Sequence, residues 1–274
     1  MCSPEEAVAW MEGVCGGFTS NPKEAEAALM EFRRSEHAVE VSKTVLERSQ
    51  HPMAQFHAAC GLQEAILTRW DAVDPSEKHA LKAYLWDFIS QNWTRLDRSV
   101  CSQVLRTFCV FWKRGWADES KEAKLELFAL LQRMGTEGGG NPLLTAKALL
   151  ALVAEFGSTK ATSLGLPLEF FRKTHREYDA IGLDQSIGLS MDLLGGVVNT
   201  VEDAMSLSDP SVLELVTVVV NVCAEVLSWE FNFVEAWQIP PTQQLIRPGP
   251  RWRRYLIRPD FLRAVFSVYQ RVSL

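Results

Sequence analysis

The chain has 274 residues and a formal net charge of −6, with 47% hydrophobic and 23% charged residues. This composition is typical of a soluble globular protein that is long enough to bury a sizeable core. The acidic balance argues against direct binding to DNA or RNA, because their phosphates favour basic proteins. We therefore expect no nucleic-acid partner.

Neither a signal peptide nor a membrane-spanning segment is predicted, so no membrane partner is expected. The first 17 residues contain three glutamates and no basic residue, unlike a secretory leader. The most apolar stretch, residues 212–227, is interrupted by two glutamates and an asparagine and is short for a bilayer. The six cysteines form no CxxC pair, which favours reduced thiols in the cytosol or nucleus.

The first predicted elements are helices that follow one another in pairs. Asn21-Pro22 places a polar cap before a proline, which is a helix-start signal, and Asp74-Pro75 repeats it. Apolar residues recur at helical spacing after both signals. The helices of the first two pairs are predicted to open at residue 22 and to span residues 35–48, 52–70 and 76–90.

Glycine and proline mark the later pairs. The third pair begins at residues 96–98, its first helix ends at Gly115, and its partner opens at Asp118. Residues 138–140 form a glycine loop before the next helix. Further helices are predicted over residues 143–156, 167–178, 183–205, 209–229 and 259–274, with loops over residues 157–165 and around the prolines at 240–250.

The pairs begin near residues 21, 52, 95, 141 and 183, at intervals of about 40 residues. This period is typical of HEAT and armadillo solenoids, in which each hairpin buries its apolar face against its neighbours. We therefore predict an all-α fold, a right-handed α-solenoid of HEAT-like helical hairpins, in which residues 1–274 form a single array. Because the last helix is apolar and has no end signal, we expect a fragment of a longer array or a truncated product.

The residue types that carry catalysis form no recognisable set. None of the five histidines lies in an HExxH motif, and neither GxSxG nor a phosphate-binding loop occurs. A deep pocket that gathered His51, His57 and Cys60 would be needed to favour an enzyme. We therefore expect a binding protein, not an enzyme, with no catalytic residues, no metal and no cofactor.

Three further features each allow a structural and a functional interpretation. The stripe of Glu36, Glu40, Lys43 and Glu47 is either a solvated helix face or a contact surface. The nine tryptophans are interpreted mainly as wedges between hairpins, with contact hot spots as the alternative. A basic cluster is either a solvated loop or a site for an acidic partner; it consists of Arg247, Arg251, Arg253, Arg254 and Arg258.

Short segments spread over residues 22–272 carry a resemblance to a known family. They are residues 28–35 (ALMEFRRS), 45–49 (VLERS), 55–59 (QFHAA), 64–65 (EA), 113–118 (KRGWAD), 154–156 (AEF) with Ser158, 165–170 (GLPLEF), 227–229 (LSW) and 251–253 (RWR). In this order and spacing they resemble the amino-terminal part of an export receptor of the importin-β (karyopherin) family of nuclear transport receptors.

The resemblance implies a function that the residue patterns do not. Members of this family are HEAT-repeat superhelices that shuttle between nucleus and cytoplasm. They bind protein cargo and Ran-GTP, and they contact phenylalanine-glycine nucleoporins in the nuclear pore. The inner helices of their first hairpins contact Ran, and here the matching helices are residues 35–48 and 76–90. The Ran-binding residues expected from this match are Glu40, Lys43, Glu47, Lys78 and Lys82.

The favoured interpretation is thus the amino-terminal part of a nuclear export receptor. Such receptors are several times longer than this chain, so a complete export cycle by the chain alone is not expected. The alternative is a generic helical-repeat scaffold that binds proteins without dependence on Ran. Binding to Ran in its GTP and GDP forms separates these two hypotheses.

Overall fold

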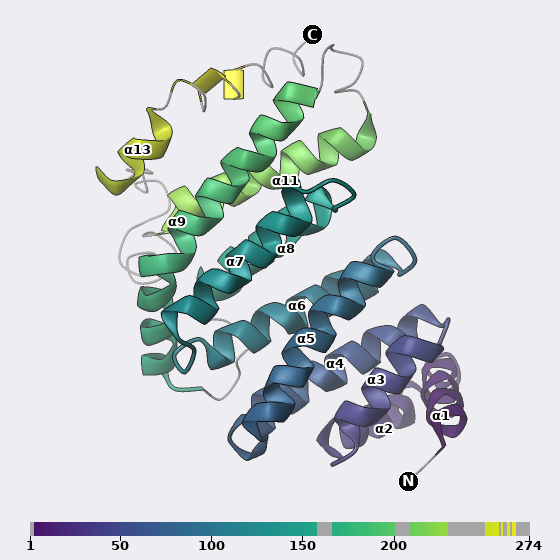
Figure 1. Ribbon diagram of the computed structural model, residues 1–274. Helices are drawn as coiled ribbons and strands as arrows, with labels where there is room; N and C mark the ends of the chain where they lie inside the picture. The colour runs from purple at the N-terminus through teal and green to yellow at the C-terminus, as the bar shows by residue number, and fades with distance from the viewer. Residues whose placement is uncertain are drawn as a thin grey trace, which may run out of the picture. The chain divides into compact units, whose positions relative to one another are not determined.

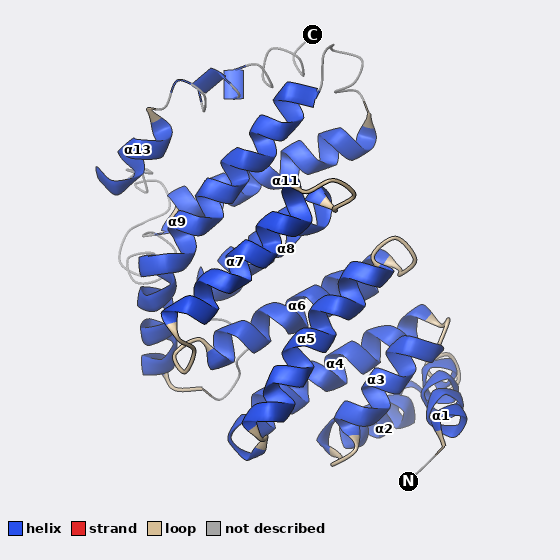
Figure 2. Cartoon of the chain, viewed as in Figure 1, coloured by secondary structure: helices blue, strands red, loops and turns tan. Residues whose placement is uncertain are grey.

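The computed structural model describes residues 3–157, 166–200, 209–229, 250–257, 259, 262–263 and 265–266 (Figure 1). Every regular element within these residues is a helix, and no strand occurs among them (Figure 2). This confirms the predicted all-α helical-repeat class. The fold divides into two compact units, Met1–Gly115 and Trp116–Leu274, which are described separately below. The handedness of the solenoid stays a prediction.

The first unit consists of consecutive helices in which α4 is the central element. Helix α4 packs against α2, α3 and α6, while α1 packs against α2 and α3, and α5 against α6. The helices are α1 (Pro4–Gly17), α2 (Pro22–Arg34), α3 (Ala38–Arg48), α4 (Pro52–Arg69) with the 3₁₀ turn η1 (Trp70–Ala72), α5 (Pro75–Asn92) and α6 (Arg98–Gly115). The helices α2 to α6 therefore lie close to the predicted ranges, whereas the closest packing joins α4 to α3 and α6 and not to α5, its predicted partner.

The core of the first unit is apolar and closely packed. Leu46, Leu62, Leu85 and Ile89 are completely buried. Some buried polar groups are hydrogen-bonded across helices; for example, Thr107 Oγ1 donates to the Ala59 carbonyl oxygen at 3.2 Å. Such bonds offset the cost of removing polar atoms from water, so they fix the register between α4 and α6.

The second unit is built around α8. Helix α8 packs against α7, α9 and α11, and α7 and α11 each also contact α9. The helices are α7 (Lys121–Thr136), α8 (Pro142–Gly157), α9 (Leu168–Thr200), α11 (Pro210–Leu227) and α13 (Arg253–Leu256), which follows the 3₁₀ turn η4 (Pro250–Trp252). A cluster of aromatic rings lies at the centre, where Phe156 stacks on Tyr178 with ring centroids 4.2 Å apart.

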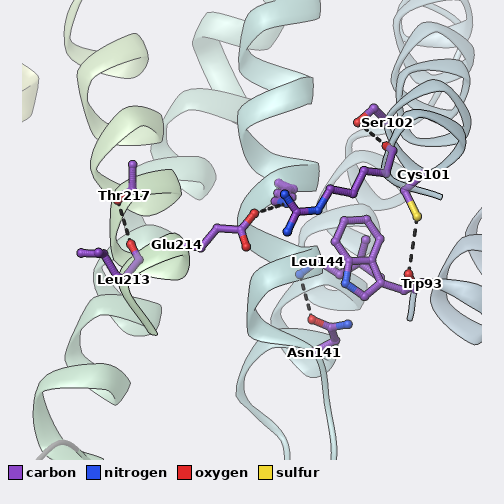
Figure 3. Close-up of polar contacts among 10 residues, drawn as sticks. Trp93, Cys101, Ser102, Asn141, Leu144, Leu213, Glu214 and Thr217 are labelled. Carbon is purple, nitrogen blue, oxygen red and sulfur yellow. Dashed lines mark hydrogen bonds and ion pairs between the residues drawn. The ribbon is translucent and has the colours of Figure 1, made fainter. Parts of the chain in front are cut away.

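Polar contacts hold α8 in place within the second unit (Figure 3). At its start, Asn141 Oδ1 accepts a hydrogen bond from the Leu144 N–H at 2.9 Å. Farther along, Lys147 Nζ lies 2.6 Å from Glu214 Oε1 of α11, so this ion pair joins the two helices. Asn141, which precedes Pro142, thus caps the start of α8.

Four predictions about the helices differ from the structure. The helix predicted from residue 35 begins at Ala38, and Ser35 is instead the C-cap of α2. Helix α1 was not predicted, although Ser3 and Glu6 form a reciprocal capping box at its start. The partner helix α7 opens after Ser120, whose Oγ accepts from the Ala123 N–H, and not at Asp118. The two helices predicted over residues 167–178 and 183–205 are one continuous helix, α9, through residue 200. Its predicted end, at residues 201–205, lies outside the described residues.

Helix α11 is long and apolar enough, by length and composition, to cross a membrane. The core helices of soluble proteins share this property. Here Val219, Val222 and Val226 are buried, and Glu214 is paired with α8. We therefore interpret α11 as a packed helix of the second unit.

The basic cluster is partly neutralised within the chain. Arg251 forms an ion pair with Asp179 of α9, and Arg254 forms one with Asp184. These pairs attach η4 and α13 to α9, which favours a structural role over a site for an acidic partner. Arg247 and Arg258 lie outside the described residues, as do the loop over residues 158–165 and most of the helix predicted over residues 259–274.

Candidate functional site

The residues expected to bind a partner lie on α3 and α5 of the first unit. Lys43, Lys78 and Lys82 are half-buried, whereas Glu40 and Glu47 are exposed. Helix α3 is held by α4, and α5 is held by α6, so both are positioned by buried neighbours. The structure therefore presents all five side chains from packed helices and none from a loop.

The first patch, which we call the α3–α5 seam, consists of Lys43, Glu47 and Tyr84. Lys43 Nζ lies 4.8 Å from the centroid of the Tyr84 ring. The Tyr84 hydroxyl donates to the Lys43 carbonyl oxygen at 3.4 Å. Burial raises the pKa of Tyr84, and the Glu47 carboxylate raises it further. The phenol therefore stays protonated at neutral pH and ties α5 to α3 as a hydrogen-bond donor.

The second patch, which we call the α5–α6 seam, consists of Trp70, Lys78, Lys82 and Trp112. Lys78 Nζ lies 4.6 Å from the Trp70 ring centroid, and Lys82 Nζ lies 4.3 Å from the Trp112 ring centroid. Both rings are buried, so the ammonium groups cover their outer faces. Each cation–π contact contributes about 0.5–2 kcal/mol and holds the lysine in a defined place.

The two seams lie on different sides of α5. Lys82 and Tyr84 are two residues apart, which is about 200° around a helix. The structure therefore brings Lys43 and Glu47 together at Tyr84, and Lys78 and Lys82 together at the tryptophans, with α5 between the two groups. Glu40 lies one turn before Lys43 on α3 and contributes an exposed carboxylate.

Ammonium groups that rest on apolar rings favour contact with an acidic protein surface. Each ammonium can still donate hydrogen bonds to an incoming carboxylate while its stem is already ordered. Binding of a partner therefore costs less side-chain entropy at these lysines than it would at freely moving lysines. The exposed Glu40 and Glu47 add carboxylates, which favours a partner surface of mixed charge.

The rings below the lysines were missed by the sequence analysis. Trp70 and Trp112 were interpreted as core wedges, and their burial is consistent with that. They also seat the lysines, a role that no residue spacing reveals because each ring comes from a different helix than its lysine. Only the tertiary contacts of α5 with its neighbours identify these pairs.

The histidines and cysteine that would have favoured an enzyme do not form a catalytic set. His51 caps α4, with its Nδ1 accepting from the Ala54 N–H at 3.4 Å. His57 Nδ1 instead accepts from Arg33 Nη2 at 3.0 Å and stacks on the Phe18 ring. Burial raises the pKa of the Cys60 thiol, which disfavours the reactive thiolate. Among the described residues, no group of histidine, cysteine and carboxylate side chains is arranged to hold a metal ion.

Comparisons with known proteins identify the family of the chain. A family model described as exportin-4 matches residues 2–273. The chain is also 20% identical to exportin-7-A of Xenopus laevis over 279 aligned residues, a match that covers 99% of this chain and 25% of that protein. The chain thus spans about a quarter of the length of this relative. The family match confirms the resemblance to an importin-β-type export receptor, and the chain belongs to the exportin-4 family.

Proposed function

We propose that this chain is the amino-terminal, Ran-GTP- and cargo-binding part of a nuclear export receptor. The observation that carries the proposal is the exportin-4 family match over residues 2–273, together with the lysines held on α3 and α5. Exportins are transport receptors and not enzymes. Because the chain covers 25% of exportin-7-A, we propose that further repeats of a longer array complete the cargo surface.

The proposed mechanism is thermodynamic linkage between two ligands. If Ran-GTP and cargo each bind better to the same conformation of the helical array, each raises the affinity for the other. Hydrolysis of GTP on Ran then releases both. The receptor is proposed to shuttle between nucleus and cytoplasm and to cross the pore by contacts with phenylalanine-glycine nucleoporins.

The test is the affinity of the chain for Ran loaded with a non-hydrolysable GTP analogue, compared with Ran-GDP. We expect measurable binding to the GTP form that is at least about tenfold tighter than to the GDP form. Equal affinity for the two forms, or no binding to either, would contradict the proposal and favour a scaffold without Ran dependence.

Variants of α5 test the surface itself. Lys78→Met with Lys82→Met removes both charges but keeps an unbranched side chain over each tryptophan ring. We expect Ran-GTP affinity to fall about tenfold. The thermal unfolding midpoint should change little, because contacts between the methionine sulfur and the ring offset the lost cation–π contacts. Lys23→Met is the matched control, since Lys23 is an exposed lysine on α2 away from both seams, and it should leave affinity unchanged.

A further inference from the structure

A groove runs between α1 and α2 at the start of the first unit. It consists of two hollows of about 410 Å³ and 450 Å³. Both hollows are lined by Trp10 of α1 and Ala28 of α2, so they adjoin on either side of this pair. We call them together the Trp10 groove. Val41 of α3 also lines one hollow, and no residue of α5 lines either. None of the expected Ran-binding residues lines the groove.

The groove is open because alanine, glycine and serine make up much of its lining. Gly13 lines one hollow, and a Cβ atom placed on it would meet no atom within 4 Å. Trp10 rests on Phe32, with ring centroids 5.5 Å apart, yet 41% of its surface is exposed. By contrast, Trp70, Trp86, Trp112, Trp116, Trp229 and Trp252 are buried. An exposed tryptophan beside a hollow is typical of a contact that a partner covers.

Two carboxylates flank the groove. Glu24 lines one hollow and Glu31 lines the other, with Ala28 between them on the same stripe of α2. Both glutamates are exposed, and neither forms a hydrogen bond or ion pair with another residue that the structure describes. Seven residues separate them, which corresponds to two helical turns and about 10 Å. The groove therefore combines an apolar centre with a negative charge at each end.

We propose that the Trp10 groove binds a short extended peptide segment of a protein partner, in which an apolar side chain lies between two basic residues. The charge pattern selects the occupant, because two carboxylates complement two cations. In an extended chain alternate side chains share a face, so two cations four positions apart flank one side chain on that face. Their backbone positions are about 13 Å apart at about 3.3 Å per residue, and long arginine or lysine side chains can adapt this spacing to carboxylates about 10 Å apart. The side chain between them is then placed to enter the groove beside the Trp10 ring.

The probe is a fluorescently labelled synthetic peptide with arginines at two positions four apart and a leucine midway between them. Binding to the full chain is followed by fluorescence anisotropy. Two counterpart peptides carry glutamates in place of the arginines, or serine in place of the leucine. We expect both counterparts to bind at least about tenfold more weakly, because one reverses the charge and the other removes the buried apolar group.

Two leucine substitutions on α1 form a matched pair. Gly13→Leu places a side chain in the open space of the groove and is expected to weaken peptide binding by at least about tenfold. Gly16→Leu is its control, because a Cβ on Gly16 also meets no atom within 4 Å, but Gly16 lines neither hollow. Both variants are expected to be at least as stable as the parent chain to thermal unfolding, since leucine favours a helix over glycine.

The carboxylates are tested in the same way. Glu24→Gln and Glu31→Gln are each expected to weaken binding about threefold, as for a single exposed ion pair, whereas Glu26→Gln on the same helix leaves it unchanged. Equal binding to Gly13→Leu and Gly16→Leu, equal binding of the basic and acidic peptides, or no binding would overturn the proposal. A dimer of the chain in sedimentation that Gly13→Leu alone dissociates would overturn it too, because the groove would then hold a second copy.

Discussion

The contact between Arg33 and His57 makes the folding stability of the chain depend on pH through a single residue. His57 Nδ1 accepts a hydrogen bond from Arg33 Nη2, so the imidazole is neutral in the fold. Burial, and to a smaller extent the positive charge of Arg33, together lower the pKa of His57 from its ordinary value of 6.5 to about 4. In the unfolded chain this ring regains its ordinary pKa.

A loss of stability below neutral pH follows from this shift. Between pH 6.5 and 4 the unfolded chain takes up a proton at His57 that the folded chain does not, so folding stability falls as the pH falls. We expect a loss on the order of 2 kcal/mol for this half-buried ring. His57→Gln removes the titrating group, so its stability, measured by urea unfolding at pH 7 and pH 4.5, should fall less over that interval than that of the parent chain.

The exposed His79 supplies the control, since His79→Gln is expected to keep the pH dependence of the parent chain. If His57→Gln and the parent lost the same stability between the two pH values, the account of this histidine would be wrong.

At the residue scale, the sequence identified the charged residues but not the aromatic rings on which the lysines rest. The lysines of α3 and α5 were singled out through a family resemblance, and the structure adds the aromatic ring below each one. Local patterns cannot reveal such pairs, because Lys78 and Trp70 belong to different elements and meet only through packing. The five expected Ran-binding residues themselves remain a prediction.

At the scale of elements, start signals were predicted well and helix lengths less well. Asp74-Pro75 is a real cap, with Asp74 Oδ1 accepting from the Ser76 N–H at 2.8 Å. Helix α9 was predicted as two helices, over residues 167–178 and 183–205, and the interval between them contains Gly182, a residue type of low helix propensity. In the structure, the Tyr178 ring packs directly against the bare backbone of Gly182. Tertiary packing of α9 against α7, α8 and α11 thus overrides its weak helix propensity.

Helix α1 shows the opposite error. Its glycines gave little periodic signal, yet residues 3–6 (SPEE) match the capping-box pattern of a serine followed three positions later by glutamate. The signal was therefore present in the sequence. This signal is local, whereas the predicted helices rest on apolar periodicity over a longer stretch of sequence.

Close packing of α4 against its neighbours gives a further prediction. A Cβ atom on Gly61 would lie 2.8 Å from Ser42 Oγ and 2.9 Å from Phe32 Cε1, so α4 approaches both α2 and α3 closely. Gly61→Ala is expected to lower the free energy of unfolding by about 1–2 kcal/mol, because overpacking outweighs the gain in helix propensity. Gly16→Ala, which meets no neighbouring atom, should instead raise it by about 0.5–1 kcal/mol. Chemical denaturation measures both, and a Gly61→Ala chain as stable as the parent would contradict the close approach.

At the scale of the whole molecule, the repeat spacing of about 40 residues was the most useful property of the sequence. It predicted the fold class because each hairpin buries its face only against its neighbours, so the pattern of one repeat sets the architecture of all. Partner identity could not follow from this spacing, since the same architecture serves many functions. That step rests on the family match over residues 2–273.

The most direct test of the central claim is hydrogen exchange of the full chain alone, with Ran bound to a non-hydrolysable GTP analogue, and with Ran-GDP. The account predicts slower amide exchange in α3 (Ala38–Arg48) and α5 (Pro75–Asn92) with the GTP form and no change with the GDP form. Protection confined to the second unit, equal protection by both forms of Ran, or no protection at all would contradict it.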